Sequence, residues 1–339
     1  MLTDLGITVP VLAAPMAGGP TTPELVVAAG RAGSMGFVAG GYRTPQALAE
    51  QITRVRGAGV PFGVNLFVPD RRPVSIEDFD AYRTALTREA ARYGVTLPDA
   101  PTTDDDHWAD KIALLLDDPV PVVSFTFGLP DRATVDALRA KGTLVVQTVT
   151  SPHEARLAEE SGAQALVVQS SAAGGHSATF TPSRTPPPLP LPRLVRDVAH
   201  AVELPLVAAG GIAGPADVTA ALRAGGQAVA VGTVLLRTHE SGASAPHRGA
   251  LVDAAFDDTV VTRAFTGRPA RALRNEFTDR MGPLAPNAYP AVHHLTRPLR
   301  TAATEAGDTR AIHLWAGTGY RHARAEPVAD TLDRLAGQE

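Results

Sequence analysis

A glycine pair followed by a histidine, Gly174-Gly175-His176, is the stretch of the sequence best suited to chemistry. Glycine adopts positive φ angles without a steric penalty, so the backbone at this pair can approach a bound group closely. Histidine is the side chain whose unperturbed pKa lies nearest neutrality, which suits it to proton transfer. An apolar run at 165–168 leads into Gln169, so the pair follows a predicted buried strand. We expect a functional loop here; a glycine-rich turn with an incidental histidine is the alternative.

Glycine-rich turns also mark the last two apolar runs before residue 238. Gly210-Gly211 closes the run at 206–212, and Gly232-Thr233 lies within the run at 228–236. In barrels of alternating strands and helices, such turns after strands seven and eight bind phosphate through backbone N–H groups and the helix dipole. The glycines could simply tighten the turns, but their joint occurrence favours a phosphate site.

Three amide side chains, Asn65, Gln147 and Gln169, lie within predicted apolar strands. A buried amide is costly unless it forms hydrogen bonds, and a flavin ring would offer partners for such bonds. Hydrogen bonds inside the protein are the alternative explanation. Taken together with the phosphate site, the amides favour flavin mononucleotide (FMN) as the cofactor.

The composition argues against several other chemistries. The 339 residues include no cysteine, which excludes disulfides, zinc–thiolate sites and thiol nucleophiles. His153-Glu154 lacks the second histidine of a helical zinc motif, and no Gly-x-Ser-x-Gly indicates a serine hydrolase. His293-His294 is expected to be a solvated pair in a loop. We predict no metal site, so a bound organic cofactor must carry the difficult chemistry.

Eight short apolar runs alternate with helical patterns before residue 238. Apolar runs without polar alternation are typical of strands that are buried on both faces. The count predicts an α/β fold, a (β/α)8 TIM barrel, whose active site lies at the carboxyl ends of the strands. A doubly wound open sheet is less favoured because no Gly-x-Gly-x-x-Gly follows a strand. The connection at 70–119 is long and carries an extra predicted helix at 75–93.

The alternation of strands and helices stops at His239. From there we expect a mostly helical C-terminal insertion that caps the barrel mouth, with one of its helices at 270–280. A last helix at 327–336 would be the eighth helix of the barrel. The predicted domains are an FMN-binding barrel of residues 1–238 and 312–339 and a smaller capping or substrate domain of residues 239–311.

The charge distribution limits the classes of partner. Lys and Arg number 31 against 35 Asp and Glu, a formal net charge of −4, so nucleic acid is not an expected partner. The uncharged stretch at 5–23 is interrupted by prolines and glycines, so it is not expected to span a membrane. No basic residue precedes Arg31, so we expect no secretory signal and a cytoplasmic location.

Several motifs resemble those of the nitronate monooxygenase family, formerly called 2-nitropropane dioxygenases. The resemblance spans the barrel and continues into the C-terminal part. The motifs are Ala14-Pro-Met-Ala-Gly-Gly-Pro20, Gly63-Val-Asn-Leu-Phe67, Val123-Ser-Phe-Thr-Phe-Gly128, Ala173-Gly-Gly-His176 with Thr179-Phe180, Ala209-Gly-Gly-Ile212, Ala264-Phe-Thr-Gly-Arg-Pro-Ala-Arg271 and Leu314-Trp-Ala-Gly317.

The resemblance implies an FMN enzyme that oxidises alkyl nitronates, such as propionate 3-nitronate, with O₂ to a carbonyl product and nitrite or nitrate. His176 would be the catalytic histidine near the flavin. The partners would be a small-molecule nitronate and O₂, with no nucleic acid or membrane, and we also consider a homodimer. The residues expected to bind FMN are Pro15, Met16, Asn65, Gln169, Gly174, Gly175, Gly211, Ala230, Val231, Gly232 and Thr233.

Some positions depart from the family pattern. Ser170, Ala172 and Ala178 stand where the family often has Gly, Glu and Gly, Ala230 replaces a frequent Gln, and Thr126 a frequent His. At Ala230 only a backbone contact can remain. The changes leave two alternatives open: an NAD(P)H-dependent flavin reductase of quinones or enoyl thioesters, and a non-catalytic FMN-binding barrel. In a nitronate enzyme, a protonated His176 would hold the nitronate oxygens, whereas a neutral His176 would deprotonate a nitroalkane.

Overall fold

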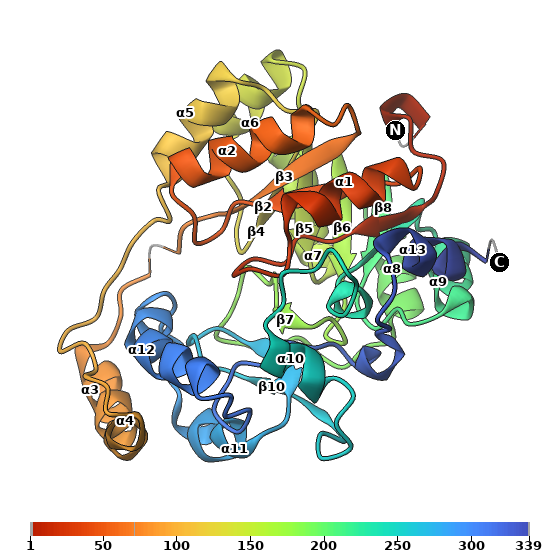
Figure 1. The fold of residues 1–339 in the computed structure, drawn as a ribbon. Coiled ribbons are helices and arrows are strands. Elements are labelled where there is room, and N and C mark those ends of the chain that lie inside the picture. The colour runs from red at the N-terminus through yellow and green to blue at the C-terminus, as the bar shows by residue number, and fades with distance from the viewer. Residues whose placement is uncertain (1–2, 71, 338–339) are drawn as a thin grey trace.

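Eight parallel strands close into a barrel in the computed structural model, which describes residues 3–70 and 72–337 (Figure 1). The last strand pairs with the first, with Leu12 opposite Ala230, so the barrel has no open edge. The predicted TIM barrel is therefore confirmed. Its strands, in spatial order, are β1 (Val11–Ala13), β2 (Gly36–Ala39), β3 (Phe62–Phe67), β4 (Val122–Thr126), β5 (Leu144–Val149), β6 (Ala165–Gln169), β8 (Leu206–Ala209) and β9 (Ala228–Val231).

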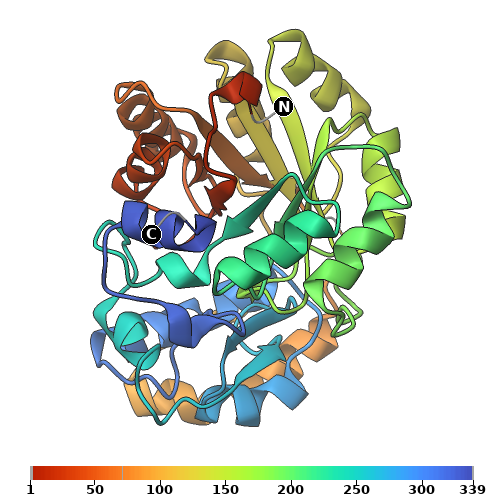
Figure 2. The same ribbon diagram turned by 90° about the vertical axis from the view of Figure 1, so that its right-hand side faces the viewer.

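Helices surround the barrel strands (Figure 2). The first two begin where the sequence predicts, because Thr22 and Thr44 accept hydrogen bonds from N–H groups of the first turn and a proline follows each threonine. The last helix packs against α1 and α9, which confirms the predicted eighth barrel helix. The surrounding helices are α1 (Pro23–Arg31), α2 (Pro45–Arg56), α5 (Trp108–Asp117), α6 (Arg132–Ala140), α7 (Pro152–Glu160), α8 (Leu191–Ala199), α9 (Pro215–Arg223) and α13 (Val328–Ala336).

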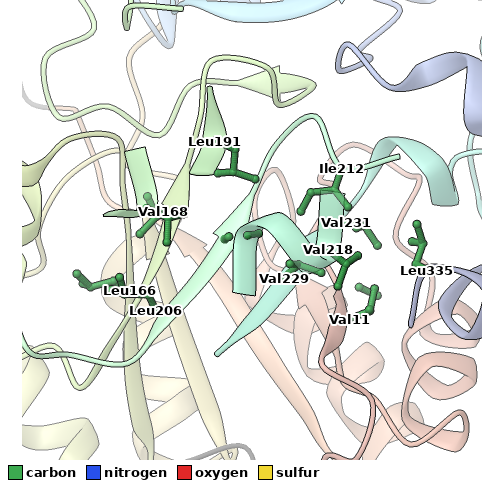
Figure 3. Packing of buried hydrophobic residues seen from close by; sticks show 14 of the residues in the cluster. Val11, Leu166, Val168, Leu191, Leu206, Ile212, Val218, Val229, Val231 and Leu335 are labelled. Atoms are coloured by element: carbon green, nitrogen blue, oxygen red, sulfur yellow. The ribbon is translucent and has the colours of Figure 1, made fainter. Parts of the chain in front are cut away.

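The core of the barrel has two layers. Outside the strands, Val168 and Val229 pack against helix residues such as Val218 and Leu335 (Figure 3). Inside the barrel, a separate cluster fills the space between the strands and includes Phe37. Because burial of one such side chain stabilises the fold by about 1.5–3 kcal/mol, the two layers hold the strand ends in fixed positions.

The cap contains a small antiparallel sheet as well as helices. This sheet has the order β10 (Thr259–Thr262), β11 (Ala270–Leu273) and β7 (Gly175–His176). The prediction of a helix over 270–280 is wrong for its first part, because residues 270–273 pair with strands on both sides. Asn275 then caps the helix that follows, its side chain accepting a hydrogen bond from Thr278 N. The helices of the cap are α10 (Ala245–Ala250), α11 (Glu276–Met281) and α12 (Ala291–Glu305).

Two helices from the connection between β3 and β4 also pack on the cap. They are α3 (Ile76–Ala85) and α4 (Thr87–Tyr93), where one helix is predicted, and both contact α12 (Figure 1). Phe79 and Tyr82 belong to the hydrophobic core of the cap. The predicted domain boundaries remain a prediction, and α3 and α4 lie on the cap although the boundaries assign them to the barrel.

Four short 3-10 helices complete the secondary structure of the described residues. Among these residues, no helix combines the length and the apolar character needed to cross a bilayer. The short helices are η1 (Thr3–Leu5), η2 (Thr233–Leu235), η3 (Gly282–Leu284) and η4 (Tyr320–His322).

Candidate active site

A cavity of about 1230 Å³ lies between the barrel and the cap at the carboxyl ends of the strands and continues into the barrel interior, where Leu12, Phe37 and Val207 line it. Sites for one small molecule usually measure about 300–1,000 Å³, so this cavity has room for a cofactor and a substrate together. Every residue predicted for the site lines it: Pro15, Met16, Asn65, Gln169, Gly174, Gly175, His176, Gly211, Ala230, Val231, Gly232 and Thr233.

Gly174 lies where three segments of the chain meet. A Cβ atom at this position would lie 2.5 Å from Gly317 N and 2.8 Å from Thr233 Oγ1. These two neighbours are themselves joined, since Gly317 N donates to Thr233 Oγ1 at 2.9 Å. Gly175 has a different requirement, because its φ of 75° is one that residues with a side chain rarely adopt. Each glycine of the pair therefore has its own structural reason.

The turn after β8 presents backbone to the cavity. Gly211 has a φ of 76°, and a Cβ there would lie 2.9 Å from Ala172 Cβ. The start of α9 is already occupied, because Asp217 Oδ2 accepts hydrogen bonds from Ala213 N at 2.9 Å and Gly214 N at 3.0 Å. On this side the cavity is lined by Gly211 and by the turn at 230–233.

The amide of Asn65 is held by neighbouring side chains and lines the cavity. Its Nδ2 donates to Ser124 Oγ and to Thr126 Oγ1, both at 2.9 Å. Thr126, one of the departures from the family pattern, thus fixes the orientation of this amide. Gln147 differs, since its Nε2 donates to the carbonyls of Phe125 and Gly128 and its side chain does not line the cavity. Hydrogen bonding within the protein accounts for Gln147.

Gln169 connects the end of β6 to the loop that carries the histidine. Its Nε2 donates to the carbonyl oxygen of His176 at 3.2 Å, and its Oε1 accepts from Ala178 N at 2.8 Å. The side chain therefore holds the chain at the end of β7 and just after it while it lines the cavity.

His176 is held by the barrel and the cap together. Its backbone pairs with Ala270 of β11, and its Nε2 lies 2.9 Å from Thr266 Oγ1. The imidazole lies among aromatic rings, with centroid distances of 5.6 Å to Phe127 and 5.4 Å to Trp315. These contacts fix the position and the orientation of the ring.

Burial lowers the pKa of His176 to about 3, and the positive charges of Arg268 and Arg300 contribute to the shift. The imidazole is therefore neutral at pH 7. Burial also lowers the pKa of each arginine to about 10, so both remain cations. Among the described residues, neither guanidinium has a carboxylate within salt-bridge distance; their partners are carbonyls, a hydroxyl and histidines.

The sequence did not identify the residues that the cap contributes. His293, expected to be solvated, stacks face to face on Tyr42 with centroids 4.4 Å apart and lines the cavity. Arg300 and Thr304 line it too, at seven and eleven residues further along α12. This spacing places the three residues on one face of the helix. Polar residues that recur at helical spacing are therefore the feature of the sequence that could have indicated them.

Comparisons with known proteins agree with this geometry. The chain matches the family model described as nitronate monooxygenase over residues 1–337. A protein named "Probable nitronate monooxygenase" from Staphylococcus saprophyticus is 34% identical over 325 residues, which cover 94% of this chain and 90% of the relative.

Solved structures are similar over nearly the whole chain. A nitroalkane oxidase from Streptomyces ansochromogenes has 47% sequence identity and a TM-score of 0.94, covering 99% of this chain and 96% of its own. FabK from Thermotoga maritima is less similar, with 26% identity, a TM-score of 0.76, and coverage of 99% and 94%. By its motifs, its site and its relatives, the chain belongs to the nitronate monooxygenase family of flavin-dependent oxidoreductases.

Proposed function

We propose that the protein oxidises alkyl nitronates with bound FMN and O₂, giving a carbonyl product and nitrite or nitrate. Within the family, one observation supports an anionic substrate: neutral His176 lies in the field of two buried arginines that have no carboxylate partners. Carboxylates also line the cavity, at Asp104–Asp106 and Glu305, but among the described residues none lies within salt-bridge distance of the two arginines. Beside the arginines, an anion is therefore favoured over a neutral molecule of the same shape. The nitronate is that anion, and the nitroalkane is its neutral conjugate acid.

The low pKa of His176 also bears on its role. A base that is protonated only near pH 3 is poorly matched to removing a proton from a neutral nitroalkane at pH 7. A nitronate needs no such step, so the neutral imidazole can orient it by a hydrogen bond. A bound anion would also offset the field of Arg268 and Arg300 and raise the pKa of the imidazole. His176 is then able to take up a proton during turnover.

The cavity fits FMN on the barrel side. The volume of about 1230 Å³ and the backbone that Gly211 and the turn at 230–233 present to the cavity support the binding of a phosphorylated ring system. When bound, FMN would supply the electron acceptor that none of the side chains can provide. Ala230 would contribute through its backbone alone. We propose that the residues holding FMN are Pro15, Met16, Asn65, Gln169, Gly174, Gly175, Gly211, Ala230, Val231, Gly232 and Thr233.

The aromatic side chains around His176 would exclude water from the reacting groups. Phe127, Tyr289 and Trp315 all lie within 6 Å of the imidazole, measured between ring centroids. Hydrogen bonds and charges act more strongly in such a dry environment than in water. The cap therefore provides two of the three enclosing rings, Tyr289 and Trp315, and the barrel provides Phe127.

The test is to compare oxygen consumption and nitrite release with ethyl nitronate, nitroethane and NADPH as alternative substrates. We expect turnover of the nitronate, slower turnover of nitroethane and no rapid bleaching of the flavin by NADPH. Flavin released by acid should be identified as FMN by chromatography and mass. Rapid reduction by NADPH without nitronate turnover would favour a flavin reductase, and a protein that takes up no flavin would refute the cofactor.

A further inference from the structure

Six side chains form a closed ring on the cap side of the cavity, and all of them line it. We call this set the roof ring. On one side of His176, Tyr289 leads to His293, with centroid distances of 5.9 and 6.4 Å, and on the other Trp315 leads to His313, with distances of 5.4 and 5.5 Å. Arg300 closes the ring opposite His176. The members are His176, Tyr289, His293, Arg300, His313 and Trp315.

Arg300 is a buried cation with no anion. Its side chain donates to Thr296 Oγ1 at 3.1 Å and to the carbonyl oxygen of His293 at 2.9 Å. The remaining bonds go to His313 Nε2 at 3.5 Å and His293 Nδ1 at 3.3 Å. A guanidinium has five N–H groups, so one stays unused, and among the described residues no carboxylate lies within salt-bridge distance of it. Buried charges are ordinarily paired, so this arrangement calls for a ligand.

The bonds from Arg300 also fix where the two histidines carry their protons. A guanidinium cannot accept a hydrogen bond, so His293 Nδ1 and His313 Nε2 must be the acceptors. Burial and the charge of Arg300 lower the pKa of both imidazoles, which are therefore neutral. Each neutral ring then has its N–H on the other nitrogen. For His313 this is Nδ1, a buried atom with no partner among the described residues.

The roof ring thus offers a cation, an unpartnered imidazole N–H and no negative charge. We propose that Arg300, together with the N–H group of His313, binds the negative charge of the substrate and makes the site select nitronates over neutral nitroalkanes. This inference rests on the proposed function. Arg268 is not suited to the role, because it does not line the cavity and donates to the carbonyls of Ser177 and Thr179.

Steady-state kinetics of R300M, R300K and a control, R88Q, test the proposal. Arg88 is an exposed residue of α4, which packs against α12 outside the cavity, so R88Q removes the same charge without touching the site. For R300M we expect the KM for ethyl nitronate to rise roughly 10- to 100-fold, the range of a lost charge-assisted hydrogen bond, with kcat changed much less. The KM for nitroethane should change less than about threefold, and R88Q should match the wild type. Equal effects on the two substrates would overturn the assignment.

Lysine at position 300 keeps the charge but not the forked geometry, so R300K should give a smaller rise in KM. If R300M does not fold, R300K still tests the proposal. A KM for ethyl nitronate in R300K equal to that of the wild type would contradict the role of the forked guanidinium.

A binding experiment separates this inference from the proposed function. Inorganic nitrate is a planar anion with oxygens like those of a nitronate, and a ligand that binds only the folded state raises the unfolding temperature. At constant ionic strength, nitrate should raise the unfolding temperature of the wild type and R88Q but not of R300M. If this holds and the wild type does not oxidise nitronates, the proposed function fails while the anion site stands. If nitronates are oxidised and R300M still binds nitrate, the anion site fails alone.

Discussion

The barrel and the cap contribute different kinds of group to one cavity. The barrel supplies backbone and amides, as at Gly211 and Asn65, whereas the cap supplies a hydroxyl, an aromatic ring and a charge from Thr266, Tyr289 and Arg300. Backbone contacts need a fixed path of the chain but tolerate changes of side chain, as we propose for Ala230. Side-chain contacts allow a substrate preference to change by substitution without altering the fold. We infer that the barrel determines the cofactor and the cap determines the substrate.

The two regions meet at β7. This strand belongs to the loop after β6, yet it pairs with β11 of the cap through Gly175 opposite Arg271 and His176 opposite Ala270 (Figure 1). The hydrogen bond from Ser177 N to Pro269 O, at 2.8 Å, extends the pairing. His176 is therefore placed by both regions, and changes at the junction should affect function more than changes within either region.

The largest effect is expected from H176N. The variant lacks the imidazole, so turnover of ethyl nitronate should fall by about 10²-fold or more. The flavin should stay bound, because the bond from Gln169 to residue 176 uses the backbone carbonyl, which asparagine keeps. Flavin absorbance per protein and oxygen consumption measure the two properties separately. Activity within threefold of the wild type would remove His176 from the reaction.

G174A should damage the contact between barrel and cap. The new methyl group would lie 2.5 Å from the backbone nitrogen of Gly317, which the chain can relieve only by moving. We expect a loss of about 1–3 kcal/mol in the free energy of unfolding and a lower flavin content. The control is G249A, since Gly249 lies in α10 with nothing within 4 Å of the added atom. If both variants retain flavin and stability equally, the close approach at Gly174 has no functional importance.

The same contrast explains what the sequence could predict. Barrel strands are buried on both faces and therefore appear as apolar runs, and Thr22-Pro23 and Thr44-Pro45 mark helix starts by local chemistry. The strand at 270–273 has no such local signal, because Ala, Arg and Leu all favour a helix. Its partners, β10 and β7, select the strand conformation, and β7 lies almost one hundred residues away. Pairing over that distance is not visible in a local pattern.

The candidate site divides in the same way. The glycines and amides stand out because their residue types are unusual within apolar strands, and all of them except Gln147 line the cavity. The arginine at position 300 looks ordinary on a polar helix face. Its importance depends on which groups surround it, namely two neutral histidines and no carboxylate, and only the folded arrangement shows this.

A smaller effect should appear as a pH dependence of stability that originates in the cap. Burial lowers the pKa of His247 from its ordinary value of 6.5 to about 4, while its Nε2 donates to Trp315 O at 3.0 Å. The unfolded chain therefore binds a proton at a higher pH than the folded chain, so stability is lost as the pH falls from about 6.5 towards 4. Between pH 7 and pH 5, this histidine should account for a loss of about 1–2 kcal/mol.

H247Q tests that contribution by denaturant unfolding at the two pH values. Glutamine keeps an N–H donor for the carbonyl of Trp315 but does not titrate, so the variant should lose about 1–2 kcal/mol less than the wild type between pH 7 and pH 5. A slope that H247Q does not reduce would show that the acid sensitivity lies elsewhere.

The smallest effect concerns the boundary between the regions. Tyr82 of α3 is buried, and its hydroxyl donates to the carbonyl of Ala264 in the cap at 2.6 Å. Y82F leaves this carbonyl without its donor, so we expect a loss of about 1 kcal/mol. If α3 is a structural part of the cap, amide hydrogen exchange should accelerate in α3 and in β10 and β11 but not in the barrel strands. Equal acceleration in β4 would instead mean that barrel and cap open as one unit. The two regions would then contribute different groups to the cavity without differing in stability.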